Sequence, residues 1–262
     1  MEGRVFFIGT SDYGGIPRIA CDCPVCKSRN EIDMRNRPSV YLPECKILIN
    51  VPYEFRDSMV LNVYSMPDVK CVLLTSHFMH NIMGFDDIKT FTLRRPIPVF
   101  GSEETIKLFR KQFSYFFREH SEGGGTPNVE TYEIKPRFGA NDIDVCSFPV
   151  NGYSNFPVYG YRIKEIVCIF DCLQIPKSSI SVASNSNILI INLIFRDGYT
   201  LGESVSATFA IIKTLRPQRA YVTQIPHDFF HLELQKAFDD LKSSIHIEIA
   251  TDNKLISDYL LI

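Results

Sequence analysis

Short apolar runs of strand length recur along the whole chain and predict a protein rich in β-structure. Residues 5–8, 69–74 and 188–195 are the clearest of these runs, because each is nearly continuous and has strand length. Shorter runs predict further strands at residues 40–51 (two strands around Pro43), 96–100, 129–134, 143–150, 158–163, 166–170, 220–222 and 245–249. Strands therefore dominate both halves of the chain.

Apolar residues with helical spacing are interspersed among these strands. In residues 103–120, Ile106, Phe109, Phe113 and Phe116 recur every three or four positions, which predicts an amphipathic helix. Further helices are predicted at residues 54–63, 204–215 and 228–241, at a helix start over residues 85–88, and in a terminal helix from Asn253. The interspersed strands and helices predict the α/β class.

Composition and charge narrow the class of protein. The chain is 45% hydrophobic and 22% charged, which is typical of a globular protein whose core needs no disulfides. The net charge of −2 argues against a protein that is basic all over, although local basic patches remain compatible with it. We see neither a signal-peptide pattern nor an apolar run of about 18 residues, so we expect a cytoplasmic protein that spans no membrane.

Three cysteines, Cys21, Cys23 and Cys26, lie within six residues. A disulfide between Cys21 and Cys23 would be strained, because a disulfide needs particular Cα and Cβ separations. Three thiolates on one tight loop can instead point at one cation, and a distant His or Cys would then complete a structural zinc site. The alternative is three unligated thiols in an exposed loop.

The most informative stretch covers residues 75–84, between the predicted strand 69–74 and a predicted helix. Its sequence, TSHFMHNIMG, resembles the loop T-H-x-H-x-D-H-x-x-G of the metallo-β-lactamase superfamily. The ligand positions of that loop are occupied here by Ser76, Phe78, His80 and Asn81. A serine, a phenylalanine and an asparagine cannot replace three imidazoles around Zn²⁺.

Further segments resemble one branch of this superfamily, that of the cyclic phosphodiesterase that accompanies carbon–phosphorus lyase. They are residues 9–17, the Cys21, Cys23 and Cys26 trio, and residues 35–39, 47–56, 84–87, 148–163, 169–171 and 222–227. The resemblance implies one domain over residues 1–262, a metallo-β-lactamase-like αββα sandwich of two mixed β-sheets flanked by helices. It also implies that His227 completes one structural zinc site on the loop at residues 21–26.

The catalytic metal site that the resemblance implies is degenerate in this chain. Its seven ligand positions are Ser76, Phe78, His80, Asn81, Gly152, Asp171 and Gln224. Only Asp171 carries the family's residue, and His80 stands where the family has Asp. Because hydrolysis by this fold depends on a metal-generated hydroxide, we expect a catalytically inactive protein.

A fold that keeps its structural zinc site but lacks the catalytic metal ligands predicts a binding factor rather than an enzyme. The superfamily includes RNA-processing nucleases, so fold-level analogy favours the ribosome or another RNA–protein particle as partner, with no small-molecule substrate. The chain is similar to a dormancy (hibernation) factor that blocks a functional site of the idle ribosome. Lys and Arg supply sequence-independent affinity for phosphates, and the candidates beside the zinc loop are Lys27, Arg29, Arg35 and Arg37.

Two alternative functions stay open from the residues alone. A metal-dependent phosphodiesterase could use a rebuilt or mononuclear site made of Asp171, His80 and His77, with ligand atoms within about 2.0–2.2 Å of one ion. A small-ligand binder could instead use the vacated pocket, whose lining would be Phe78, Asn81, Gly152 and Gln224.

Overall fold

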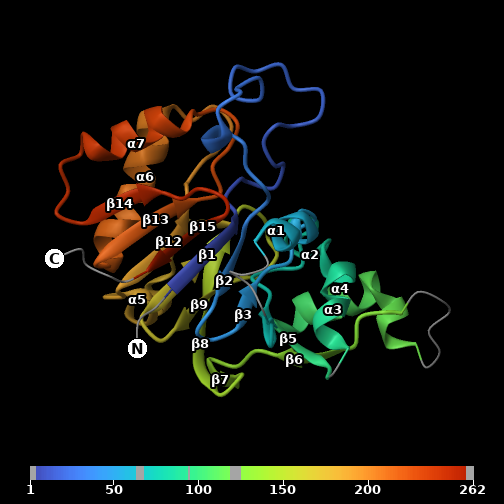
Figure 1. Cartoon of the computed structure of the whole chain (residues 1–262). Helices are drawn as coiled ribbons and strands as arrows, with labels where there is room; N and C mark the ends of the chain where they lie inside the picture. Colours follow the sequence, from blue (N-terminus) through green and yellow to red (C-terminus); the bar gives the residue numbers. More distant parts are fainter. Residues whose placement is uncertain (1–3, 63–67, 94, 119–124, 258–262) are drawn as a thin grey trace.

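Two mixed β-sheets packed face to face form the centre of the computed structural model, which describes residues 4–62, 68–93, 95–118 and 125–257 (Figure 1). The strands of the first sheet, in pairing order, are β15 (Lys254–Ser257), β1 (Arg4–Gly9), β2 (Ser39–Leu42), β3 (Ile47–Ile49), β4 (Cys71–Leu73), β5 (Ile97–Gly101) and β6 (Val129–Glu133). The second sheet contains β11 (Cys172–Gln174), β8 (Ile143–Gly152), β9 (Val158–Ile163), β10 (Ile166–Ile169), β12 (Ile188–Asn192), β13 (Arg219–Thr223) and β14 (His246–Ile249), and β7 (Arg137–Ala140) pairs with β8.

Helices cover the outer face of each sheet (Figure 1). The first sheet carries α1 (Phe55–Leu61), α2 (Met79–Ile82), the 3₁₀ turn η2 (Phe85–Ile88), α3 (Lys89–Thr92), α4 (Glu103–Gln112) and the 3₁₀ turn η3 (Ser114–Phe117). The second carries α5 (Lys177–Ala183), α6 (Leu201–Leu215) and α7 (His231–Asp239), and a further 3₁₀ turn, η1 (Glu31–Asp33), lies between β1 and β2.

The alternation of side chains along the strands produces these layers. In β1, Val5 and Phe7 pack between the two sheets, whereas Phe6 and Ile8 pack under the helices of the first sheet. Because both faces of the central strands are buried, their sequences read as continuous apolar runs rather than alternating ones. The predicted sandwich of two mixed sheets flanked by helices is confirmed.

The terminal helix predicted from Asn253 is wrong. Residues Lys254–Ser257 form β15, which pairs antiparallel with β1, so that Val5 lies opposite Ile256. The open edge of β1 offers backbone hydrogen bonds that an isolated helix could not match, and this pairing decides the local structure.

The helix predicted over residues 103–120 is shorter than expected. Helix α4 ends at Gln112, a 3₁₀ turn follows, and residues 119–120 lie outside the described part of the chain. The elements missed by the sequence prediction are β7, β11, α2, α5 and the 3₁₀ turn η1, all of them between three and seven residues long. Such short elements carry too few periods to be recognised from apolar spacing.

The connection between β1 and β2, residues 10–38, projects from one end of the sandwich (Figure 1). It is held by a parallel bridge between Ser11 and Ile225, beyond the end of β13. The loops that follow β4, β10 and β13 meet at this end, as expected for the carboxyl ends of parallel strands. Within the described residues, none of the helices has the length and apolar character needed to cross a bilayer.

Candidate functional site

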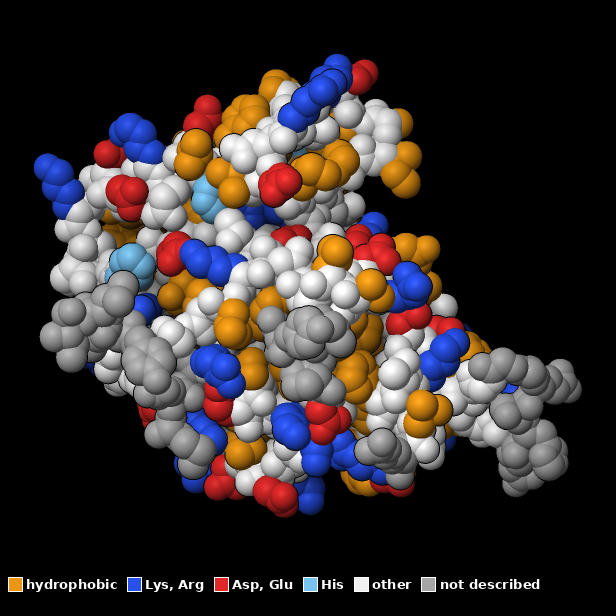
Figure 2. All heavy atoms as spheres, viewed as in Figure 1, with side chains coloured by type: hydrophobic (Ala, Val, Ile, Leu, Met, Phe, Trp, Pro, Cys, Tyr) orange, Lys and Arg blue, Asp and Glu red, His pale blue; other side chains and the backbone are white. Residues whose placement is uncertain are grey.

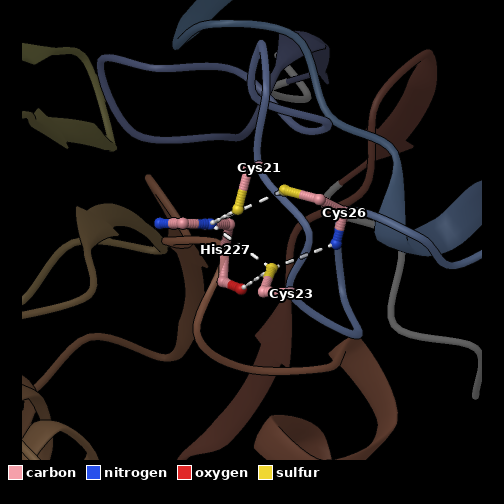
Figure 3. Close-up of side chains that lie close together, drawn as sticks. All are labelled: Cys21, Cys23, Cys26 and His227. Atoms are coloured by element: carbon pink, nitrogen blue, oxygen red, sulfur yellow. Dashed lines mark hydrogen bonds between the residues drawn. The ribbon is translucent and has the colours of Figure 1, made fainter.

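The three cysteines of the β1–β2 connection surround the imidazole of His227, which lies just beyond β13 (Figure 3). The distances from His227 Nδ1 to the sulfurs of Cys21, Cys23 and Cys26 are 3.3, 3.4 and 3.6 Å. All four ligand atoms lie within 4.8 Å of one another. The structure therefore brings together the four residues that the sequence predicted as one metal site.

These distances fit a tetrahedral zinc ion. Zinc–sulfur bonds of about 2.3 Å and zinc–nitrogen bonds of about 2.0–2.1 Å, set at tetrahedral angles, separate each sulfur from the nitrogen by about 3.5 Å. Backbone N–H groups support the sulfurs, because Arg18 donates to Cys26 Sγ and Cys26 donates to Cys23 Sγ, each at 3.3 Å. The donor set, its spacing and its supporting bonds all suit a closed structural site.

A second polar centre lies at the ends of β4, β10 and β13, around the carboxylate of Asp171. Gln224 Nε2 donates to Asp171 Oδ1 at 2.7 Å, and Asn81 Nδ2 donates to Oδ2 at 3.0 Å. His80 Nε2 lies 3.2 Å from Oδ1 and 3.4 Å from Oδ2. Four residues from the predicted degenerate site therefore form one hydrogen-bonded cluster.

The protonation state of this cluster follows from its contacts. Burial acts to raise the pKa of Asp171, but the charge of His80 and the hydrogen bonds from His80, Asn81 and Gln224 outweigh it, so the pKa is lowered. An ionised carboxylate only accepts hydrogen bonds, so His80 presents a ring N–H at Nε2 to Asp171. Phe78 stacks on this ring with a centroid separation of 5.6 Å.

The donor set around Asp171 does not fit a catalytic metal ion. The two oxygens of Asp171 already accept hydrogen bonds from two amides and an imidazole, and amide nitrogens are not metal ligands. Ser76 accepts from Asn81 at 2.8 Å, and a side chain at Gly152 would meet the backbone oxygen of Asp171 at 3.0 Å. The carboxylate and imidazole that remain are too few for a dinuclear site.

His77 does not join this cluster, contrary to the three-ligand site considered from the sequence. Its ring packs edge-on against Phe156 at 4.6 Å and beside Phe78 at 5.1 Å. Its Nδ1 is buried without a hydrogen-bond partner, and burial lowers the pKa of the ring. Among the described residues, the only group of three or more metal-ligand side chains found together is the cysteine cluster with His227.

Three residues of the polar network adopt left-handed backbone conformations that favour glycine. The φ angles are +61° at Asn50, directly after β3, +54° at Asp171, between β10 and β11, and +51° at Gln224, directly after β13. Side chains hold them there: Gln224 Oε1 accepts from the backbone N–H of Asp171 at 2.7 Å, and Asn50 Nδ2 donates to Asn81 at 3.1 Å. Such strained positions persist where the surrounding structure fixes them, and they gather at functional sites.

A pocket of about 830 Å³ opens beside the Asp171 cluster and reaches the cysteine cluster. His80, Asp171 and Gln224 line one part of it, and His227 lines another. Sequence reasoning did not single out the other charged and polar residues of the lining, which are Asp12, Tyr13, Arg18, Tyr153, Asn192, Arg196, Asp197 and Asp228. Tyr153 and Asp228 directly follow Gly152 and His227, but only the fold brings all these residues together.

The basic residues proposed for RNA contact divide into two groups. Lys27 and Arg29 are exposed beside the cysteine cluster. Arg35 is only 4% exposed and donates to Thr10 and to the backbone of Ala250, so it cannot contact a partner.

Arg37 is also occupied, because it forms an ion pair with Glu54. Figure 2 shows Lys and Arg side chains interspersed with Asp and Glu over the face in view rather than gathered into one basic patch. The ribosome or another RNA–protein particle stays a prediction, now without the support of Arg35 and Arg37.

Comparison with known proteins supports the fold. No family model matches the chain. The chain superposes on a diphosphatase of the PhnP family with a TM-score of 0.81, at 23% identity over 98% of this chain and 97% of the other. It superposes on the metallo-β-lactamase fold protein YhfI from Bacillus subtilis with a TM-score of 0.70, at 15% identity over 98% and 100% of the two chains.

One curated relative is an octanoyltransferase from Porphyromonas gingivalis, 26% identical over 193 residues. That match covers 72% of this chain but only 39% of the relative.

The prediction that the chain has no enzymatic activity is contradicted, because the proteins it is similar to include a diphosphatase and a transferase. The missing ligands argue only against a metal-generated hydroxide, and they leave the His80–Asp171 pair in place. By its two sheets, their order and their helical covers, this chain has the metallo-β-lactamase fold.

Proposed function

We propose that the chain is a phosphodiesterase whose acid–base residue is His80, oriented by Asp171. The observation that carries the proposal is the 3.2 Å contact between His80 Nε2 and Asp171 Oδ1 inside the large pocket. An imidazole whose ring is oriented by a carboxylate can act as a general acid–base group. The likeness to a diphosphatase supports phosphate chemistry for this fold.

The charges of the pocket disfavour a substrate with two negative charges more than a substrate with one. Arg18 and Arg196 supply positive charge, while Asp12 is paired with Arg18 and Asp171 is held by three donors. Two further carboxylates, Asp197 and Asp228, line the pocket and would repel a dianion. A phosphodiester, with one charge, suits this balance better than a phosphomonoester, with two.

The reaction needs only a water molecule and the residues described. His80 Nδ1 accepts a proton from water as its oxygen bonds to phosphorus, and the bond to the leaving alkoxide breaks. The protonated ring then returns that proton to the alkoxide, while Asp171 stabilises the charged ring. General acid–base catalysis of this kind contributes roughly 100- to 10,000-fold in rate.

We also propose that Cys21, Cys23, Cys26 and His227 hold one structural zinc ion. The ion would tie the β1–β2 connection to the segment after β13, which both contribute to the pocket wall. Its role is to hold these segments in place, because four protein ligands leave no open position for substrate.

The test is hydrolysis of bis(4-nitrophenyl) phosphate and of 2′,3′-cyclic nucleoside phosphates by the purified protein. We expect His80→Ala to lower kcat by at least about 100-fold, whereas the matched change His77→Ala leaves it within about twofold. Equal turnover by the His80→Ala variant and the unmodified protein would rule the proposal out, and so would no turnover by the unmodified protein.

A further inference from the structure

The hydroxyl of Tyr153 is held in the pocket by the backbone of the segment that follows β12. Phe195 N donates to Tyr153 Oη at 3.1 Å, and both residues line the pocket. The two preceding residues of that segment are anchored as well, because Leu193 N donates to the end of β13 at 2.7 Å and Ile194 N donates to a side chain of α6 at 2.8 Å. Three successive backbone N–H groups therefore fix the support on which the hydroxyl rests.

Tyr153 starts from a position beside Asp171 in the second sheet. It directly follows Gly152, the residue of β8 that pairs with Cys172 of β11. Burial, together with the charges of Cys172 and Asp171, outweighs the opposing backbone hydrogen bond and raises the pKa of Tyr153 to about 12. The hydroxyl consequently keeps its hydrogen at neutral pH.

A tyrosine hydroxyl that accepts one hydrogen bond still has a hydrogen to donate. Within the described part of the chain, that of Tyr153 has no acceptor, since its one hydrogen bond is the one it accepts from Phe195. Asn192, another polar residue of the lining, differs in this respect. Its amide accepts from the backbone of Cys172 and donates to the backbone of Cys172 and Leu193. Tyr153 is thus a neutral donor that the fold leaves available in the pocket.

We propose that Tyr153 donates its hydroxyl hydrogen to a non-bridging oxygen of the substrate phosphate and stabilises the negative charge of that oxygen in the transition state. The inference rests on the proposed function for the reaction, and it names a further catalytic residue. A donor that is fixed in place before the reaction stabilises such charge without reorganising, and loss of one donor of this kind costs about 100- to 1,000-fold in kcat.

The first test compares Tyr153→Phe, which removes only the hydroxyl, with the unmodified protein in hydrolysis of bis(4-nitrophenyl) phosphate. We expect kcat to fall by about 100-fold and KM to rise by no more than about threefold, because the bond is strongest in the transition state. Calorimetry reports whether the variant is folded. Tyr159→Phe is the matched control, because it removes a hydroxyl from β9 outside the pocket lining, and it should stay within about twofold.

A second measurement depends on the hydrogen bond and not on how much of the protein is folded. The two enantiomers of 4-nitrophenyl phenyl phosphorothioate present either sulfur or oxygen to the hydroxyl of Tyr153, and sulfur is the weaker acceptor. Tyr153→Phe should reduce the ratio of the two rates by about tenfold, whereas Tyr159→Phe should leave it unchanged. The folded fraction cancels from this ratio. An unchanged ratio in Tyr153→Phe, whatever the change in kcat, would assign Tyr153 a structural role and overturn the inference.

Binding without turnover separates the inference from the proposed function. The probe is diphenylphosphinate, a monoanion whose two P–C bonds a phosphodiesterase cannot hydrolyse. Its dissociation constant, measured by isothermal titration calorimetry, should rise about threefold in Tyr153→Phe. Weaker binding by this variant, without hydrolysis of any diester by the unmodified protein, would remove the proposed function and leave Tyr153 as an anion donor. Hydrolysis that depends on His80 but not on Tyr153 would do the reverse. A folded protein that neither binds nor hydrolyses would overturn both.

Discussion

The cysteine cluster and the Asp171 cluster share a pocket wall, yet they retain different chemistry. Around His227, three sulfurs and one nitrogen present lone pairs to a common point, and their spacing suits an ion. Around Asp171, amide and imidazole hydrogens point at the carboxylate and take the places that cations would occupy. The first region has the geometry of a metal site, and the second is held together by hydrogen bonds.

The difference shows that amide side chains can hold a buried carboxylate in place by hydrogen bonds alone. A histidine ligand offers one lone pair, whereas Gln224 both donates to the Asp171 side chain and accepts from its backbone. Asn81 similarly links Asp171 to Asn50 and Ser76. These amides hold the left-handed backbone at Asp171 in the absence of any ligand ion.

The largest effect should come from breaking the metal-dependent region. Cys23→Ser removes one of four ligands, and we expect zinc content to fall from about one ion per chain to near zero and the Tm to drop by roughly 10 °C. Elemental analysis and calorimetry measure both. Cys146→Ser, in β8 and outside the cluster, should keep its zinc. A Cys23→Ser protein with full zinc content would show that the cluster is not the metal site.

Breaking the hydrogen-bonded region should cost less. Asp171→Asn turns one acceptor toward the N–H groups of Asn81 or Gln224 into a donor, so we expect the free energy of unfolding to fall by about 2–3 kcal/mol at pH 7. Urea denaturation measures it. The exposed change Asp144→Asn is the control and should stay within about 0.5 kcal/mol.

The Asp171→Asn variant also tests how folding stability depends on pH. The pKa of Asp171 is lowered from its ordinary value of 3.8, so the carboxylate stabilises the folded state above that value and loses this contribution as pH falls through the folded pKa. The stability difference between the unmodified protein and Asp171→Asn should therefore be largest near neutral pH and shrink below about pH 4. A difference that grows on acidification would contradict the hydrogen-bonded, ionised state.

The smallest effect tests how closely the surrounding atoms pack against Gly152. A Cβ at Gly152 would lie 2.9 Å from Val158 Cγ2 and 3.0 Å from the backbone oxygen of Asp171, so Gly152→Ala should destabilise the protein by about 1–2 kcal/mol. Gly139→Ala is the matched control, because nothing lies within 4 Å of its added Cβ. Equal stability of the two variants would mean that the vacated space remains open.

The sequence was informative where chemistry depends on residue type and local spacing. Three cysteines in six residues predicted the metal cluster, and continuous apolar runs predicted the central strands such as β10 and β12. The family resemblance supplied His227, some 200 positions away, which spacing alone could not find. It also named Asn81, Asp171 and Gln224, which the structure brings together with His80 in one hydrogen-bonded cluster.

What could not be predicted depends on geometry created by the fold. From the sequence, Asn81 and Gln224 were interpreted only as missing metal ligands. Their hydrogen bonds to Asp171 could not be predicted, because they form only where the ends of the strands converge. Arg35 looked like a surface cation, yet the turn after β1 and the segment before β15 enclose it. Arg18 was not singled out for the same reason. It contacts His227 and lines the pocket only once the fold brings together segments that are distant in sequence.

The pairing of β1 with β15 has a consequence for how the chain folds during synthesis. Arg4 lies opposite Ser257, so β1, once made, waits for a strand far along the chain before this edge is covered. Contacts of such wide sequence separation form slowly, and an uncovered strand edge can pair with other chains in the meantime. Aggregation of nascent or truncated chains should therefore depend on residues 254–257, far from both clusters. A synthetic peptide of that sequence, added during refolding, offers a way to cover the edge early.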